Sequence, residues 1–278
     1  MTPPIDGFKS ATLKHVREGW WTDEFTEFLV ETLRPRPGNR ILDVGCGEGL
    51  AEVSLGRLHI SQIRLVGIDL IVSKVAAALQ ATKSHNQRVG FAAADAAHLP
   101  FRAGAFDSLY CIAVLQHIVD AGAAVAECAR VTTQHGRIVA VEPDNAARYL
   151  FSSVPAGVKA FDLAREFFAA AAEARGERTL DQIGPKLPAL FGANGIEPIH
   201  VRLFPVSHTR LRPPSTDEWT ERRNAIQHVI ERVTRKDVRE LGRELLHALG
   251  TYQTDASVAA AFVEIQHTML FATVGQKN

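Results

Sequence analysis

The run ILDVGCGEG, residues 41–49, constrains the fold of this chain more than any other stretch of the sequence. Its first four residues are apolar except for one aspartate, a pattern typical of a short parallel strand buried on both faces. Gly45, Gly47 and Gly49 follow at alternate positions and supply the φ values that a tight turn into a helix needs. The free N–H groups at the start of that helix favour negatively charged ligand groups. We therefore predict a strand, a turn and a helix whose backbone can approach a bound nucleoside.

Two other kinds of glycine-rich turn do not match this run. A nicotinamide-dinucleotide turn needs a third glycine three residues after the second, and Leu50 occupies that position when the count starts at Gly47. A Walker loop needs a closing Gly-Lys-Ser or Gly-Lys-Thr, which the run lacks. We therefore do not expect a pyrophosphate ligand at this turn.

Acidic residues stand at the ends of the next two predicted strands. The apolar run 63–68 ends at Asp69, and the run 88–93 leads to Asp95 and the small residue Ala96. A carboxylate at the end of the second strand is placed to accept both hydroxyls of a ribose. Asp69 could equally cap the helix that follows it. The order of glycine turn, Asp69 and Asp95 predicts a βαβαβ half that binds a nucleoside.

Two more strands continue the alternation of strand and helix. Phe106 and Asp107 lead into the apolar run 108–114, and His117 comes shortly after it. The segment GRIVAVEPD, residues 136–144, predicts a fifth strand. We therefore expect a parallel sheet of at least five strands.

With these motifs, residues 40–142 resemble the class I S-adenosylmethionine-dependent methyltransferases. The resemblance implies an α/β fold with a Rossmann-like seven-stranded, mostly parallel sheet whose last strand is antiparallel, and with helices on both faces. An inserted helical lid is expected in addition, where the family often has a short hairpin. It also implies S-adenosyl-L-methionine as the cofactor, with the acid at Asp95 facing the adenine amino group. The cofactor contacts that it implies lie in the glycine turn, at the ends of the next strands and in an N-terminal helix: Asp43, Gly45, Cys46, Gly47, Asp69, Leu70, Asp95, Ala96, Cys111 and Trp21.

The remaining segments predict additions to this core. Aromatic residues recur at helical spacing before Pro35, and they either pack an N-terminal helix on the domain or place Trp20 or Trp21 near the methyl donor. The sixth and seventh strands are expected at residues 196–206 and 263–275, with amphipathic helices between them. The expected division is a helical cap at 1–38, a methyltransferase core at 39–206 and 262–278, and a helical lid at 207–261.

The family places substrate-contacting groups just after the fifth strand, which makes Glu142, Asn145 and Tyr149 candidates for one wall of the active site. Arg222, from the predicted lid, could meet a carboxylate or phosphate. Each of the four could instead be a cap or surface residue. His117 is the candidate general base, because an imidazole titrates near neutral pH, but it could equally bond the cofactor or a neighbouring acid.

Composition narrows the classes of partner. Lysine plus arginine equal aspartate plus glutamate at 31 each in 278 residues, so no overall positive field favours nucleic acid or anionic lipid. The three cysteines form no paired framework and no metal spacing, which is typical of a reducing compartment. The first thirty residues contain no signal-type apolar core, and no run approaches the ~18 apolar residues of a membrane helix. We expect a cytoplasmic protein with a small-molecule partner, without a metal or a membrane segment, and with a homodimer left open.

The sequence therefore predicts an enzyme that transfers a methyl group from S-adenosylmethionine to a small molecule, of the kind used in specialised natural-product metabolism. The acceptor atom stays open among oxygen, nitrogen, sulfur and carbon. Two alternatives remain: an S-adenosylmethionine-binding protein without turnover, and a dinucleotide-dependent oxidoreductase, which Leu50 disfavours.

Overall fold

The computed structural model describes residues 19–56, 63–83, 89–174, 176 and 182–278. Residues 1–18 of the predicted N-terminal cap lie outside these ranges, as do the expected helix end near Leu58 and the expected strand start at Arg88. Within the described ranges, no helix is long and apolar enough to cross a membrane.

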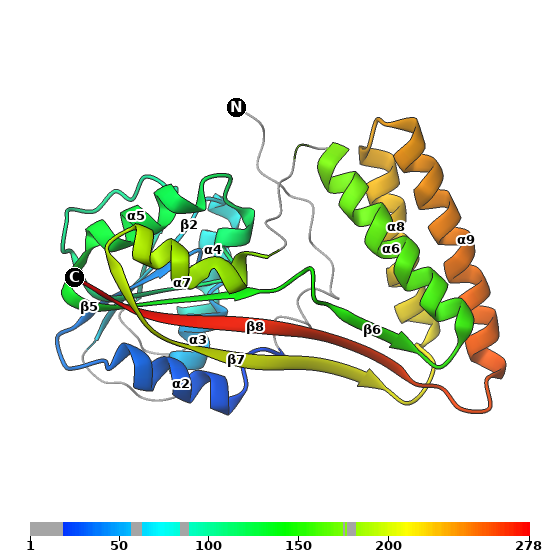
Figure 1. The fold of residues 1–278 in the computed structure, drawn as a ribbon, viewed down its shortest axis with the longest axis horizontal. Helices are drawn as coiled ribbons and strands as arrows, with labels where there is room; N and C mark the ends of the chain where they lie inside the picture. Colours follow the sequence, from blue (N-terminus) through cyan, green and yellow to red (C-terminus); the bar gives the residue numbers. More distant parts are fainter. Residues whose placement is uncertain (1–18, 57–62, 84–88, 175, 177–181) are drawn as a thin grey trace.

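One sheet of eight strands runs through the molecule (Figure 1). Neighbouring strands follow the order β3-β2-β1-β4-β5-β8-β6, and β7 pairs with the other edge of β8. β1 to β5 are parallel, whereas β8 is antiparallel to β5, β6 and β7, which confirms the mostly parallel sheet with an antiparallel last strand. The strands are β1 (Arg40–Val44), β2 (Arg64–Asp69), β3 (Val89–Ala93), β4 (Phe106–Ile112), β5 (Thr132–Pro143), β6 (Tyr149–Ser152), β7 (Ile196–Arg210) and β8 (Glu264–Lys277).

The eighth strand is β6, which the sequence does not predict. β5 pairs with residues 270–276 of β8 and leaves the beginning of that long strand without a neighbour on this edge. After a turn the chain returns to the same edge, and Tyr149 to Ser152 pair with residues 264–267 of β8. The pairing satisfies backbone groups that a bare edge would leave open. β6 therefore depends on the length of β8, which lies more than a hundred residues away in the sequence.

Helices cover both faces of the parallel part (Figure 1). Strand side chains alternate between the faces, so Leu42 and Val44 pack in a core with α5 and α7, while Ile41 packs on the opposite side with α2 and α3. The helices of this part are α2 (Asp23–Leu33), α3 (Leu50–Gly56), α4 (Val72–Thr82), the 3₁₀ turn η2 (Leu115–His117), α5 (Ala121–Val131) and α7 (Ile183–Ala193).

The starts of two helices follow directly from the local sequence. The Thr22 side chain accepts a hydrogen bond from the Phe25 N–H at the start of α2. Ser215 and Glu218 form a reciprocal capping box at the start of α8 (Thr216–Arg232).

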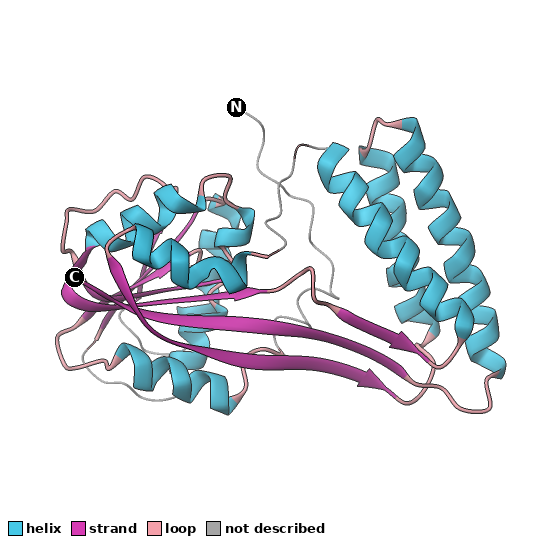
Figure 2. Cartoon of the chain, viewed as in Figure 1, coloured by secondary structure: helices cyan, strands magenta, loops and turns pink. Residues whose placement is uncertain are grey.

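The ends of β7 and β8, together with β6, extend beyond the core as a three-stranded arm that carries a separate layer of helices (Figure 2). This helical layer consists of α6 (Pro155–Ala174), α8 and α9 (Lys236–Val258), and its own apolar core contains Phe167, Trp219 and Tyr252. The predicted insertion, residues 207–261, supplies only α8 and α9. The third helix, α6, comes from the segment after β5 and packs with α8 and α9 in one apolar core.

A buried ionic network fixes the helical layer to the arm. Glu264 of β8 is fully buried and accepts hydrogen bonds of 2.9 and 2.6 Å from the two terminal nitrogens of Arg222 in α8. The Tyr252 hydroxyl of α9 donates to the same carboxylate at 2.9 Å and lies 3.0 Å from the Ser152 hydroxyl of β6. Burial alone would raise the pKa of Glu264, but Arg222 and Tyr252 outweigh it and the pKa is lowered. The network therefore joins two helices to two strands of the arm.

Candidate functional site

The glycine loop, residues 45–49, leaves β1 exactly where the sequence predicts a turn. Gly45, Gly47 and Gly49 have φ values of 79°, 55° and 82°, which favour glycine over any other residue. The N–H groups of Gly45 and Cys46 donate to the Ile68 carbonyl at 2.7 and 2.8 Å. The loop is thus bonded to the end of β2.

The space beside the loop differs from one glycine to the next. A Cβ on Gly45 would lie 2.3 Å from a methyl group of Val114, so packing within the protein excludes a side chain there. A Cβ on Gly47 would meet no described atom within 4 Å. Gly47 therefore combines a backbone conformation that favours glycine with free space beside it, which fits the close approach of a nucleoside ligand.

Asp69 closes the loop from the end of β2. Its Oδ2 accepts a hydrogen bond of 3.0 Å from the Gly47 N–H, and its Oδ1 accepts one of 2.9 Å from Ile71. Each carboxylate oxygen can accept more than one hydrogen bond, so Asp69 keeps the capacity to bind ribose hydroxyls. The neighbouring Leu70 side chain is 63% exposed and offers an apolar surface next to this carboxylate.

Asp95 and Ala96 follow β3, beside Asp69. The Ala94 N–H donates to the Asp69 carbonyl at 3.0 Å, which joins the two strand ends. Asp95 Oδ1 accepts from the Ala97 N–H at 2.9 Å, and its side chain is half exposed. The structure thus brings together the three motifs that the sequence predicts to form one cofactor site.

The rim beyond β4 and β5 is built around Glu142. This fully buried residue of β5 accepts hydrogen bonds from the N–H groups of Val114 and Leu115 at 2.8 and 2.7 Å. These bonds hold the turn that presents His117, whose side chain is exposed at the end of η2. Glu142 therefore positions the backbone of the rim.

Asn145 links the two loops of this rim. Its amide nitrogen donates to Gln116 Oε1 at 2.8 Å, and its amide oxygen accepts from Arg148 at 2.7 Å. Tyr149 lies further on, at the start of β6, and is 53% exposed. Asn145 thus lies beside the turn that bears His117, as expected of a group near the acceptor.

Three other predicted contacts occupy different surroundings. Cys111 is fully buried in the core beneath α5, because strand alternation turns it away from the face that Tyr110 occupies, so its side chain reaches no surface. The Arg222 guanidinium is engaged by Glu264 and lies 5.0 Å from the centre of the Trp219 ring, which gives Arg222 a structural role in the helical layer. Trp21 precedes α2 and packs edge-on against Phe25, with ring centres 5.3 Å apart.

The sequence analysis missed a pair of buried acids next to the glycine loop. Asp43, itself a predicted contact, is 2% exposed, and Glu52 of α3 is fully buried. Burial, followed by the proximity of Glu52, raises the pKa of Asp43, and burial raises the pKa of Glu52 to about 7. Glu52 precedes Leu55 by three residues and so shares its inward helix face, which is the signal that could have revealed it.

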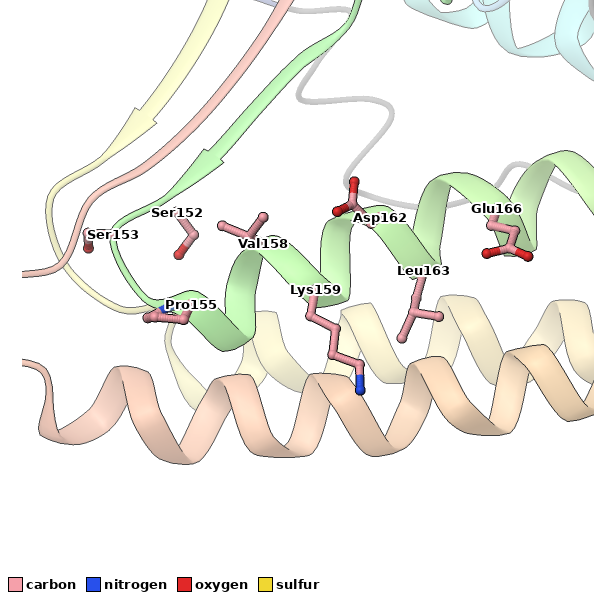
Figure 3. A pocket seen from close by; sticks show the side chains of 8 residues that line it. All are labelled: Ser152, Ser153, Pro155, Val158, Lys159, Asp162, Leu163 and Glu166. Atoms are coloured by element: carbon pink, nitrogen blue, oxygen red, sulfur yellow. The ribbon is translucent and has the colours of Figure 1, made fainter.

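A cavity of about 670 Å³ lies against α6 and the end of β6 (Figure 3). Val158 and Asp162 project from one side of this helix, and Lys159 and Leu163 project from another (Figure 3). The helical layer stands beyond the carboxyl ends of the parallel strands, the edge that carries the glycine loop (Figure 1). The cavity therefore belongs to the part of the molecule that lies beyond the predicted cofactor site.

Residues 42–140 match the family described as "Methyltransferase domain". Among curated relatives, the O-methyltransferase cnsE of Penicillium expansum is 31% identical over 170 residues, 54% of this chain and 62% of that protein. The 27-O-demethylrifamycin SV methyltransferase of Amycolatopsis mediterranei is 29% identical over 159 residues, 53% of this chain and 56% of that protein. The chain thus spans 62% and 56% of the lengths of these two relatives, respectively.

Solved structures share the fold at low sequence identity. The YcgJ protein of Bacillus subtilis has a TM-score of 0.55 at 18% identity, with 91% of this chain and 97% of that chain covered. The [4+2]-cyclase SpnF has a TM-score of 0.53 at 18% identity, with coverages of 98% and 85%. A geranyl diphosphate methyltransferase in complex with geranyl diphosphate and sinefungin has a TM-score of 0.51 at 14% identity, with coverages of 91% and 78%.

Proposed function

We propose that this protein transfers a methyl group from S-adenosylmethionine to a small-molecule acceptor, because residues 42–140 match the methyltransferase domain family. The observation that carries the proposal is the open space beside Gly47, at a positive φ of 55° and within hydrogen-bond distance of Asp69. Relatives named O-methyltransferases favour a hydroxyl as the acceptor group. The predicted cytoplasmic location and the homodimer stay predictions.

The roles of the residues follow from their places in the site. When bound, S-adenosylmethionine supplies an electrophilic methyl group on a sulfonium. The backbone of the glycine loop and the Asp69 carboxylate would hold the nucleoside, with Asp95 and Ala96 beside the base. An imidazole nitrogen of His117 would take the proton of the acceptor hydroxyl, a contribution of roughly 10² to 10⁴ in rate.

We propose that the cavity beside α6 contacts a part of the acceptor remote from its reacting hydroxyl. The cavity volume of about 670 Å³ suits a small organic molecule, since such pockets commonly measure roughly 300 to 1,000 Å³. Ser152 and Lys159 offer polar contacts, while Val158 and Leu163 offer apolar ones.

Two measurements test the proposal. Calorimetric titration should show binding of S-adenosylmethionine but not of NAD, and Asp69→Ala should weaken the binding by ~1 to 3 kcal/mol because ribose hydroxyls lose their acceptor. Asp120→Ala removes a carboxylate that caps α5 and should leave the affinity unchanged. Unaltered affinity in Asp69→Ala would contradict the ribose assignment.

Incubation with methyl-labelled cofactor and a metabolite extract, followed by mass detection, should reveal a labelled small molecule. The fold also occurs in a [4+2]-cyclase, so cofactor binding without any labelled product would support the alternative of a binding protein without methyl transfer.

A further inference from the structure

Two buried carboxyl groups lie side by side beneath the glycine loop. Asp43 is in β1, directly before the loop, and Glu52 is in α3, directly after it. Glu52 Oε1 lies 2.8 Å from the position that a Cβ would take on Gly67, and Gly67 is the register partner of Asp43 in the neighbouring strand. Because paired strands are only ~4.8 Å apart, the two carboxyl groups are neighbours.

The groups around this acid pair are all acidic or neutral. Tyr110 is the register partner of Asp43 in β4. Asp69, at the end of β2, contributes to the raised pKa of Asp43, and Asp43 in turn contributes to the raised pKa of the Cys46 thiol in the loop. Neither oxygen of Glu52, nor the Tyr110 hydroxyl, has a hydrogen-bond partner by distance and angle among the described residues. Within that part of the chain, no cationic side chain compensates the pair.

Two carboxylates in a dry site without a cation cannot both stay ionised, so the pair keeps a proton. The same physics makes paired carboxyl groups elsewhere hold one proton between them. Burial raises the pKa of Glu52 to about 7 and that of Asp43 well above its usual range, so the pair still holds protons at neutral pH.

We propose that Asp43 and Glu52 share one proton beneath the glycine loop and release it to solvent when a cationic methyl donor binds to the loop. This inference rests on the proposed function. S-adenosylmethionine carries a net positive charge, and the demethylated product has lost the sulfonium charge. A cation near the pair favours its ionised form, whereas the neutral product does not. The protein therefore binds the donor more tightly than the product. Glu52 contributes to this difference as a positioning residue, through its charge beneath the loop.

The sign of the pH dependence follows from this linkage. Below the pKa of the pair, donor binding must expel a proton, so the affinity for S-adenosylmethionine rises with pH and levels off above about pH 7. The affinity for the demethylated product changes little over the same range. The ratio of the two affinities therefore increases with pH.

Titration calorimetry at pH 7, in two buffers that differ in ionisation enthalpy, measures the released proton directly. We expect the native protein to release up to about half a proton per S-adenosylmethionine bound, and much less per demethylated product. Glu52→Gln should release less, because it lacks the proton of Glu52 and the proximity of Glu52 no longer raises the pKa of Asp43. Glu221→Gln removes an exposed acid of α8, outside the loop, and should release as much as the native protein.

Thermal unfolding without cofactor gives a second readout. The folded pKa of Glu52 is raised from 4.5 to about 7, so the native protein should lose stability relative to Glu52→Gln as pH rises through this window, with no further loss above it. If Glu52→Gln fails to fold, Asp43→Asn serves the same comparison.

The outcomes separate this inference from the proposed function. Absence of S-adenosylmethionine binding to the native protein would overturn the proposed function. If S-adenosylmethionine binds without proton release, and the stability difference between the native protein and Glu52→Gln does not change with pH, only the proposal of a shared proton is overturned.

Discussion

At the scale of single residues, Gly47 and Gly195 share a backbone conformation but not a place in the site. Both have positive φ values, 55° and 72°, and a Cβ on either would meet no described atom within 4 Å. Gly195 precedes β7, at the start of a strand that runs parallel to β5, so it lies at the opposite edge of the sheet from the glycine loop. The same substitution at the two positions therefore distinguishes the effect of backbone strain from the effect of losing a ligand contact.

We expect Gly47→Val to abolish S-adenosylmethionine binding, because the side chain would fill the space beside the loop. Gly195→Val should suffer a similar backbone strain, roughly 1 to 3 kcal/mol, and should still bind the cofactor. Calorimetry on both folded variants makes the comparison. Cofactor binding by a folded Gly47→Val protein would mean that the nucleoside lies elsewhere.

At the scale of elements, a buried charged side chain of the sheet, Glu264, links it to the helical layer, and Arg210 of β7 adds an ion pair with Glu218 of α8. Glu264 receives two hydrogen bonds from Arg222 and one from Tyr252, so it links α8 and α9 to β8. Removing only residues 207–261 would strip these helices from α6 and expose Phe167, which is fully buried. Point substitution is therefore a cleaner probe of this layer than deletion.

Glu264→Ala should lower the free energy of unfolding by roughly 3 to 5 kcal/mol, because the Arg222 charge, with a side chain only 19% exposed, loses its partner. Asp237→Ala breaks an exposed ion pair with Arg235 in the same layer and should change stability little. Chemical denaturation measures both, and hydrogen exchange should show faster opening of α8 in Glu264→Ala alone. Equal stability of the two variants would contradict the anchoring role of Glu264.

At the scale of the whole molecule, the donor and the acceptor are assigned to different parts of one sheet. The glycine loop belongs to the parallel part, and the cavity beside α6 belongs to the arm and its helices (Figures 1 and 3). The continuous β8 strand joins the two parts, since it pairs with β5 at one end and with β6 at the other. A change in the cavity should therefore affect the acceptor without affecting the donor.

Val158→Trp tests this separation, because the larger side chain would occupy part of the cavity. We expect the KM for the acceptor to rise about tenfold or more, which corresponds to a loss of roughly 1.4 kcal/mol of binding free energy. The affinity for S-adenosylmethionine should stay unchanged. Val258→Trp places the same side chain at the exposed end of α9, 80% exposed, and should leave both parameters unchanged. A rise in KM for both variants, or for neither, would mean that the acceptor does not bind in this cavity.

The sequence by itself determined the strands and the glycine turn of the parallel half. The glycine loop, Asp69 and Asp95 could be predicted because each depends on backbone conformation and on its place at a strand end, which are properties of short segments. The strands and most helices of this half follow from apolar periodicity for the same reason. The helix start at Ser215 was equally local, since a capping box is completed within four residues.

Only the tertiary structure decided which side chains meet across long stretches of chain. Arg222 reads as a candidate anion-binding residue until Glu264, 42 residues later, is found beside it. Glu52 reads as an ordinary helix acid until β1 and β2 place Asp43 and Gly67 against it. β6 exists because β8 offers it an edge. In each case the deciding energy is the burial and pairing of polar groups, and the partners of a buried group are set by packing rather than by its neighbours in sequence.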